Sequence, residues 1–305
     1  MATDPLSLWN AGEMKERIIR FVLGTTREGS ETYVAPVNRV AVFDNDGTLW
    51  VEHPYYTQLR FALDHMQALA PEHPEWNDDP LLQAALAEDI EGIAAGGMAA
   101  VAKIVAVSHT GVTTEELAGI VLDWIATQRH PRFDRLYTDL IFQPQLQLLE
   151  FLREHGYRTY IVSGGGVEFL RAWAQDIYGI PPEQVVGTSV KTAYELRDGR
   201  GVLMQLPEID LVDDGPGKPV GINKYIGRRP IIAVGNSDGD LEMMQYTTTG
   251  DGPALGIYIH HDDAEREYAY DRGAHVGGLD AGFEEAVKRD WIVVSMRNDW
   301  TQIFA

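Results

Sequence analysis

The chain has 305 residues, with 25 Lys and Arg against 46 Asp and Glu, which gives a formal net charge of -21. So acidic a chain argues against nucleic acid or an anionic membrane surface as a partner, because both require a basic face. Cysteine is absent, which excludes a disulfide framework, thiolate chemistry and a Cys-ligated zinc site. Hydrophobic residues make up 45% and charged residues 23%, the composition of a globular protein with a sizeable core.

The chain shows no targeting or membrane-spanning pattern. Residues 1–21, MATDPLSLWNAGEMKERIIRF, lack the basic start and apolar stretch of a secretory signal. We therefore expect a cytoplasmic protein, while an exported mature form whose signal has been removed would begin in the same way. The most apolar long window, residues 92–107, is rich in Ala and Gly and carries Lys103, so it predicts a buried helix and no membrane span. The oligomeric state is left open.

The chain begins with one strand followed by a long helical section. The apolar, β-branched run RVAVFDN, residues 39–45, predicts a short buried strand. The section that follows, to about residue 131, has apolar residues at helical spacing and no convincing strand. Its predicted helices span residues 55–70, 80–95 and 113–128. The last is well capped, because Thr113 or Thr114 can serve as N-cap ahead of two glutamates.

Strands and helices alternate in the rest of the chain. We expect helices over residues 143–156, 167–179 and 218–227, and strands over residues 157–166, 184–190, 229–240, 254–261 and 291–296. Residues 193–206 predict a hairpin turned at an Asp-Gly pair. Alternating strands and helices predict a mostly parallel sheet with right-handed crossovers.

The helical section interrupts this series directly after its first strand. The sequence therefore predicts an α/β fold, with a three-layer Rossmann-like core, a mostly parallel sheet and an inserted all-helical domain. We place the core in residues 1–52 and 135–305 and the insert in residues 53–134.

Polar residues follow three of the predicted strands. Asp44 and Asp46 end the first, Ser163 and three glycines end the second, and residues 236–240 end a third, one short helix after Lys218. Because ligands of open α/β sheets bind at the carboxyl ends of the strands, these groups are expected to share one site.

Each of these motifs has a plain structural explanation when it is taken alone. DNDG could be an Asx turn, SGGG a flexible turn, and Lys218 a solvated surface lysine. An EF-hand calcium loop is excluded, because its sixth and twelfth positions require Gly and Glu and hold Leu49 and Tyr55. Only the combination points to one chemistry.

Together the motifs resemble the haloacid dehalogenase superfamily, and within it the phosphoserine phosphatase-like phosphatases. FDNDGTLW is similar to the first family motif, D-x-D-G-T, and YIVSGGG to the second, a strand ending in Ser or Thr. GKPVGIN resembles the third, a lysine at the start of a helix, and VGNSDGDLEMM the fourth, a strand ending in acidic metal ligands. The resemblance implies that the all-helical insert is the cap found between the first two motifs.

The resemblance implies a Mg²⁺-dependent phosphomonoester hydrolase that acts on a small phosphorylated metabolite through an aspartyl-phosphate. Asp44 would be the nucleophile and Asp46 the general acid and base, and its neighbour Asp44 is expected to raise the pKa of Asp46. Ser163 would grip the phosphate, and Lys218 would neutralise it.

The same resemblance implies Asp44, Asp46, Asn236 and Asp240 as the Mg²⁺ ligands, with Asp46 acting through its backbone carbonyl. Asn236 stands where the family usually has an acidic residue, so the metal site loses a charge and its affinity is expected to fall. Asp238 is an extra carboxylate that could compensate, directly or through water.

For substrate binding the candidates are Gly164, Gly165, Glu52 and Arg132. Phosphoserine phosphatases place an acidic residue shortly after the first motif, and Glu52 lies one residue out of that alignment, with His53 at the matching place. The reaction is therefore carried over from the resemblance, and the phosphoserine specificity is not. Further candidates for the cleft wall are Trp50, Tyr55 and Tyr56.

Three other functions are weighed. A phosphomutase or another phosphotransferase would keep every core motif, so the sequence separates it poorly from a phosphatase. A haloalkanoic acid dehalogenase uses the same nucleophile without the second aspartate, and Asp46 argues against it. A catalytically inactive binding module on this fold is disfavoured, because all four motifs carry chemically competent residues.

Overall fold

The computed structural model describes residues 4–305, apart from the side chains of residues 94 and 98. Its centre is an eight-stranded, mostly parallel sheet with the strand order β4-β3-β2-β1-β5-β6-β7, and β8 pairs with β6. The strands are β1 (Val40–Phe43), β2 (Arg158–Gly166), β3 (Val185–Arg197), β4 (Arg200–Leu211), β5 (Ile232–Gly235), β6 (Leu255–Asp262), β7 (Ala269–Tyr270) and β8 (Ile292–Ser295). Every helix within the described residues is too short or too polar to cross a membrane.

Strand β1 lies in the middle of the sheet and is buried along its whole length. It pairs in parallel with β2, Val40 opposite Arg158, and with β5, Ala41 opposite Ile232. Its side chains alternate, so that Ala41 and Phe43 enter one core cluster and Val40 and Val42 the other. A short apolar strand of this kind belongs in a sheet that is covered on both faces.

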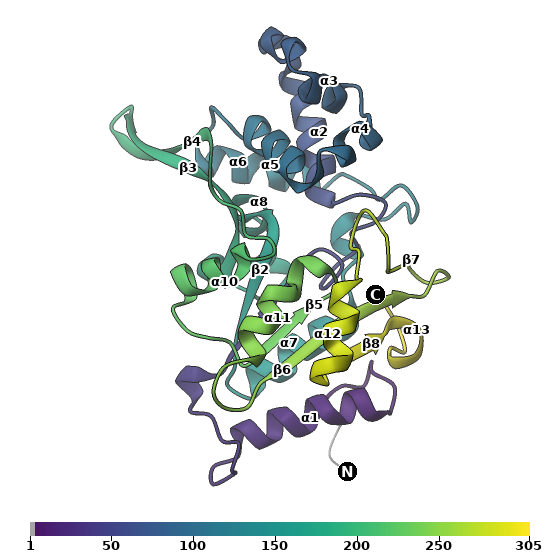
Figure 1. The fold of residues 1–305 in the computed structure, drawn as a ribbon. Coiled ribbons are helices and arrows are strands. Elements are labelled where there is room, and N and C mark those ends of the chain that lie inside the picture. Colours follow the sequence, from purple (N-terminus) through teal and green to yellow (C-terminus); the bar gives the residue numbers. More distant parts are fainter. Residues whose placement is uncertain (1–3) are drawn as a thin grey trace.

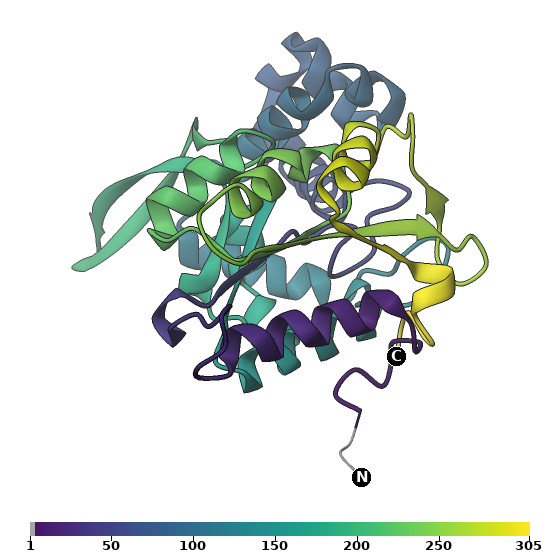
Figure 2. The ribbon, with the colours of Figure 1, turned by 60° about the horizontal axis from the view of Figure 1, so that its bottom comes forward.

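Helices cover both faces of the sheet (Figure 2). On one face lie α1 (Glu13–Thr26) and α7 (Gln143–Glu154), and on the other lie α11 (Leu241–Thr248) and α12 (Ala281–Arg289). The shorter helices of this part of the chain are α8 (Val167–Arg171), α9 (Ala174–Tyr178), α10 (Gly217–Gly221) and α13 (Met296–Asp299). The predicted three-layer α/β core with a mostly parallel sheet is confirmed.

The section after β1 is helical, as predicted, and lies at the end of the sheet where the carboxyl ends of β1 and β2 are found (Figure 1). It contains α2 (Thr57–Leu69), α3 (Pro80–Leu86), α4 (Ile90–Ala95), α5 (Gly97–Ser108) and α6 (Thr114–Ile125). The single helix predicted over residues 80–95 is wrong: it breaks into α3 and α4 at a turn where Glu88 takes a positive φ of 54°.

The helical section packs in two ways. Helices α2 to α5 share a core of their own, which includes Leu63, Met66 and Ile104. Helix α6 begins at the predicted cap, Thr113, in a full capping box with Glu116, and its apolar face joins the main core. Helices α2 to α5 therefore share a second core, while Phe61 of α2 also packs into the main one.

The predicted hairpin is present as β3 and β4, which turn at Asp198 and Gly199 and pair Arg197 with Arg200. It projects beyond the sheet beside α5 and α6 (Figure 1). The strand predicted at residues 184–190 is not separate from this hairpin. It continues through two register shifts into one strand, β3, because the parallel ladder to β2 passes directly into the antiparallel ladder to β4.

Candidate active site

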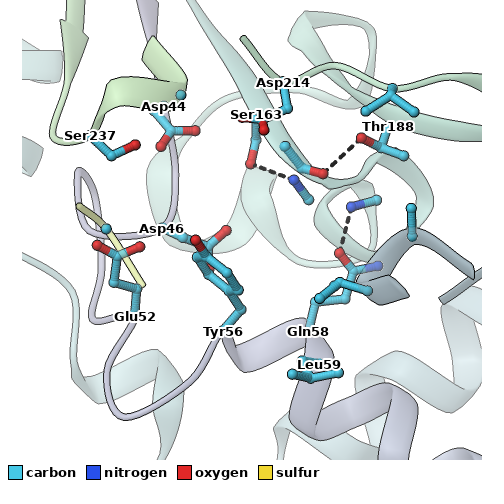
Figure 3. Close-up of a pocket in the computed structure, with 18 of the residues that line it drawn as sticks. Asp44, Asp46, Glu52, Tyr56, Gln58, Leu59, Ser163, Thr188, Asp214 and Ser237 are labelled. Carbon is cyan, nitrogen blue, oxygen red and sulfur yellow. Dashed lines mark hydrogen bonds between the residues drawn. The ribbon is translucent and has the colours of Figure 1, made fainter. Parts of the chain in front are cut away.

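A pocket of about 210 Å³ lies between the carboxyl ends of the strands and helices α2 and α5. Seven of the predicted site residues line it: Asp44, Asp46, Glu52, Ser163, Gly164, Gly165 and Lys218. The carboxyl groups of Asp44, Asp46 and Glu52 lie around one opening (Figure 3). The sheet topology thus brings the first three motifs together from positions up to 174 residues apart.

Asp44 follows β1, and its backbone amide donates to the carbonyl of Val234 in β5 at 2.9 Å. Its Oδ1 accepts a hydrogen bond from Lys218 Nζ at 2.8 Å. Its Oδ2 accepts none from any residue between 4 and 305 and belongs to the wall of the pocket. Burial and the nearby Asp240 raise the pKa of Asp44, and the ion pair with Lys218 acts in the opposite direction.

Lys218 is 1% exposed and lies between two carboxylates. Its Nζ is 2.8 Å from Asp44 Oδ1 and 2.6 Å from Asp240 Oδ1. Burial alone would lower the pKa of Lys218, but Asp240 and Asp44 outweigh it and raise this pKa. The side chain is therefore a fixed cation at neutral pH.

Asp240 has no free oxygen. Oδ1 accepts from Lys218, and Oδ2 accepts from the backbone amides of Asn236 at 3.0 Å and Ser237 at 3.1 Å. The sequence predicted Asp240 as a metal ligand. In the structure its carboxylate holds Lys218 and the backbone at the start of the fourth motif.

Asp46 faces the pocket without a direct cationic partner, and its Oδ1 accepts a hydrogen bond from the indole of Trp50 at 3.0 Å. Burial raises the pKa of Asp46, and the bond from Trp50 partly offsets it. The sequence analysis attributed a raised pKa to the neighbouring Asp44. In the structure the direction is the same, but burial is the largest cause.

Ser163 and the glycines form the side of the pocket at the end of β2. The amide of Gly165 donates to Ser163 Oγ at 3.0 Å, and the amide of Gly166 donates to Gln58 Oε1 from α2. Thr188 Oγ1 donates to the carbonyl of Gly164 at 2.7 Å and holds the loop from the side of β3. The sequence gave no signal for Gln58 or Thr188, because both act from other elements.

Asn236 and Glu52 form a buried contact beside Asp44. Asn236 Nδ2 donates to Glu52 Oε1 at 2.6 Å, and its Oδ1 accepts from Thr48 Oγ1 at 3.1 Å. Tyr270 also donates to Glu52 Oε1, at 2.7 Å. Burial raises the pKa of Glu52 well above its ordinary value, and the bond from Tyr270 partly offsets it.

Asp238 lies beside the pocket but points away from it. Its carboxylate accepts from the backbone amides of Asp280, Ala281 and Gly282 at 2.8–3.1 Å and so caps α12. The proposal that Asp238 compensates for Asn236 as a direct ligand is therefore not supported by the geometry.

Arg132 lies outside the pocket. Its guanidinium stacks over the ring of Tyr268, 4.4 Å from the centroid, and donates to the carbonyl of Ala264. Of the predicted aromatic wall residues Tyr56 lines the pocket, whereas Trp50 is fully buried behind Asp46.

Two acidic residues before the third motif were missed by the sequence analysis. Asp214 lines the pocket, and burial raises its pKa. Asp213 is fully buried, and neither of its carboxyl oxygens has a hydrogen-bond partner among the described residues. Burial raises the pKa of Asp213 to about 8, so it is mostly protonated at neutral pH.

The residues beside Asp44 fit a hard cation such as Mg²⁺. Asp44 has an oxygen free for it, the carbonyl of Asp46 receives no backbone hydrogen bond within residues 4–305, and Asn236 adds an amide oxygen. No group of three or more His, Cys, Asp or Glu side chains within the described residues could hold a metal. A metal here would therefore rely on backbone, amide and water oxygens beside Asp44.

Residues 41–245 match the family described as haloacid dehalogenase-like hydrolase, which covers most of the chain and all four motifs. The chain belongs to this family. A search of functionally curated proteins gives no match for this hydrolase.

Two solved structures share the hydrolase fold. A conserved functionally unknown protein from Anaerococcus prevotii aligns over 97% of this chain and 94% of its own, with a TM-score of 0.60 and 17% identity. A protein of unknown function from Bordetella pertussis aligns over 84% of this chain and 98% of its own, with a TM-score of 0.51 and 16% identity. At these identities the likeness extends to the fold alone.

Proposed function

We propose that this haloacid dehalogenase-like hydrolase is a Mg²⁺-dependent phosphomonoesterase that works through an aspartyl-phosphate on Asp44. The observation that carries the proposal is the contrast between its two neighbouring aspartates. Asp44 is fixed by the buried cation of Lys218, whereas Asp46 accepts a hydrogen bond from the neutral indole of Trp50; burial raises the pKa of both carboxyl groups. One carboxylate is suited to attack and the other to carry a proton.

In the first step a carboxylate oxygen of Asp44 attacks phosphorus, and the bond from phosphorus to the ester oxygen breaks. Asp46 gives its proton to the departing alkoxide, which leaves as an alcohol. Lys218 Nζ, 2.8 Å from Oδ1, holds the carboxylate of Asp44 in place for this attack.

In the second step Asp46, now ionised, takes a proton from a water molecule. The water oxygen attacks phosphorus, and the bond from phosphorus to Asp44 breaks. Inorganic phosphate leaves, and both aspartates return to their starting protonation states.

The phosphate itself would be held at the end of β2. The hydroxyl of Ser163 and the amide of Gly164 would donate to it, since the amides of Gly165 and Gly166 already donate to Ser163 and Gln58, and Lys218 offers a positive charge beside the nucleophile. This local positive charge would attract an anionic substrate in spite of the overall charge of -21.

Asp44, the carbonyl of Asp46 and Asn236 would hold the Mg²⁺ ion. When bound, the ion would neutralise charge on the phosphoryl oxygens. Asp240 is left out of this set, because Lys218 and two backbone amides already use its oxygens.

The far wall of the pocket restricts the alcohol part of the substrate. It is formed by apolar side chains of α2 and α5: Leu59, Val101, Ala102 and Val105. Lys218 is the only Lys or Arg among the described residues that line the pocket, and it is already paired twice. We therefore propose a small alcohol with an apolar surface and no negative charge, which disfavours phosphoserine because its carboxylate would lack a cationic partner.

The test is phosphate release from para-nitrophenyl phosphate and from a panel of small phosphate esters, with MgCl₂ or with EDTA. Asp44→Asn is expected to lower kcat at least about 10⁴-fold, because the nucleophile is lost. Asp123→Asn on the exposed side of α6 is the control and should leave kcat unchanged. Acid-quenched wild-type protein should carry one phosphoryl group on the peptide that contains Asp44.

Unchanged turnover in Asp44→Asn would overturn the proposal. Quantitative formation of an isomeric ester, in place of inorganic phosphate, would identify a phosphomutase instead. A wild-type protein that binds the esters and converts none would identify a binding module.

A further inference from the structure

The proposed metal site is short of negative charge. Of its three ligands, only Asp44 carries a formal charge, and that charge is shared with Lys218. The carbonyl of Asp46 and the amide of Asn236 are neutral. A divalent cation is held more weakly as the number of charged ligands falls.

The other carboxylates of the fourth motif are committed elsewhere. Asp238 caps α12 through three backbone amides, and Asp240 binds Lys218 and two amides. Neither is free to contribute charge at Asn236.

Glu52 is the carboxylate in contact with Asn236. It is 2% exposed, and its Oε1 accepts two short hydrogen bonds, from Asn236 Nδ2 at 2.6 Å and from Tyr270 at 2.7 Å. Both donors are neutral. A buried carboxylate among neutral donors and other carboxylates is costly unless a cation binds nearby.

The backbone leaves space for this carboxylate from two sides. A Cβ at Gly47 would lie 2.3 Å from Glu52 Oε1, and a Cβ at Gly277 would lie 2.0 Å from the same atom. Both glycines also have positive φ values, of 70° and 65°. Two loops 230 positions apart thus lack a side chain where Glu52 needs room.

We propose that Glu52 supplies the missing charge of the metal site through its hydrogen bond to Asn236, so that the pair acts as one charged ligand. This inference rests on the proposed Mg²⁺-dependent function. In this role Glu52 is a positioning residue for the metal site.

The hydrogen bond supports this role in two ways. It fixes the amide so that Nδ2 faces Glu52 and Oδ1, the proposed metal ligand, faces the other way, where it also accepts a hydrogen bond from Thr48 Oγ1 at 3.1 Å. It also polarises the amide, because a carboxylate that accepts from Nδ2 increases the negative charge on Oδ1.

The test is calorimetric titration of the full-length protein with MgCl₂, without substrate, at neutral pH. Glu52→Gln is expected to weaken Mg²⁺ binding about 10-fold or more, the usual effect of removing an outer-shell partner. The double variant Asn236→Asp with Glu52→Gln moves the negative charge from residue 52 to residue 236. The Kd of this variant for Mg²⁺ should return to within about 3-fold of the wild-type value. Tyr270→Phe removes a neutral donor from the same Oε1 and should change Kd less than about 3-fold.

A Kd that Glu52→Gln leaves unchanged, or that the charge exchange fails to restore in a folded protein, would overturn the inference. If Glu52→Gln does not fold, Glu52→Asp decides: the shorter side chain keeps the charge but withdraws it from Asn236 Nδ2, so Mg²⁺ should raise its Tm less than that of the wild type. An equal or larger rise would count against the role of Glu52.

The outcomes separate this inference from the proposed function. Mg²⁺ binding that depends on Glu52, in a protein that hydrolyses no phosphate ester, would overturn the function and leave the inference standing. Mg²⁺-dependent hydrolysis with a Kd indifferent to Glu52 would do the reverse.

Discussion

The two walls of the pocket are built on different principles. The floor consists of the strand-end residues Asp44, Asp46 and Ser163 with Lys218 of α10, and the roof of the helical residues Leu59, Val101, Ala102 and Val105. On the floor each charged group has a fixed hydrogen-bond partner at 2.6–3.0 Å. The roof contributes apolar surface and no formal charge.

This difference separates chemistry from selectivity. The floor is anchored in the parallel sheet, so its groups keep the positions that an in-line displacement requires. The roof belongs to α2 and α5, which have a core of their own and are joined to the sheet through loops. Changes in the roof are therefore expected to alter which ester is accepted, and changes in the floor to alter whether any ester is hydrolysed.

The largest effect is expected where the floor also supports the fold. Lys218→Met leaves the buried carboxylates of Asp44 and Asp240 without their cation and should lower the free energy of unfolding by about 3–5 kcal/mol. Lys224→Met, which removes an exposed pair with Asp210, is the control and should leave the free energy of unfolding close to that of the wild type. Urea denaturation measures both, and equal losses would show that Lys218 has no special structural role.

A large loss of rate is expected for the proton carrier. Asp46→Asn should lower kcat about 10³-fold for alkyl phosphates, whose leaving groups need a proton, and much less for para-nitrophenyl phosphate. Its Kd for Mg²⁺ should stay near the wild-type value, because the proposed ligand is the backbone carbonyl. Steady-state kinetics on the two ester classes, with calorimetry alongside, make the comparison; equal loss on both classes would contradict the role.

A smaller effect is expected beneath the floor, at Asp213. Its pKa is near 8 in the folded protein, against 3.8 ordinarily, so the folded state holds a proton that the unfolded state releases. The contribution of protonated Asp213 to the free energy of unfolding is fully present below about pH 4 and is lost as the pH rises toward and past 8. Asp213→Asn should therefore be the more stable protein at pH 8, by about 1–3 kcal/mol, with a smaller advantage at pH 5. Urea denaturation at the two pH values gives the difference, and an advantage independent of pH would refute the titration.

The smallest effect is expected in the roof. Val105→Ala should raise KM for para-nitrophenyl phosphate about 10-fold and change kcat little, because apolar contact with the alcohol part is lost. Val107→Ala lies on the same helix but outside the pocket lining, and serves as the control. Equal changes in the two variants would mean that the helix has been destabilised and that the roof makes no contact with the substrate.

The sequence was sufficient for the sheet and for the first three motifs. A buried four-residue strand followed by Asp44 and Asp46, and a strand ending at Ser163, are local patterns whose backbone consequences do not depend on distant residues. Because parallel strands present their carboxyl ends at one edge of the sheet, these residues were expected to meet there.

The sequence was insufficient wherever a side chain could face either of two partners. Asp238 and Asp240 are two positions apart and equally acidic, yet one caps a helix and the other binds Lys218. Arg132 had a suitable charge for a substrate contact and instead stacks on Tyr268. These choices depend on neighbours from distant segments.

By itself, the sequence determined the fold class, the family and the strand-end residues that meet at one site. Hydrophobic periodicity and motif order depend only on residues near one another along the chain. Only the tertiary structure decided which carboxylate serves which partner. Glu52 meets Asn236 across 184 positions and Tyr270 across 218. Such a contact depends on how distant loops pack around a buried carboxylate, so no local sequence pattern predicts it.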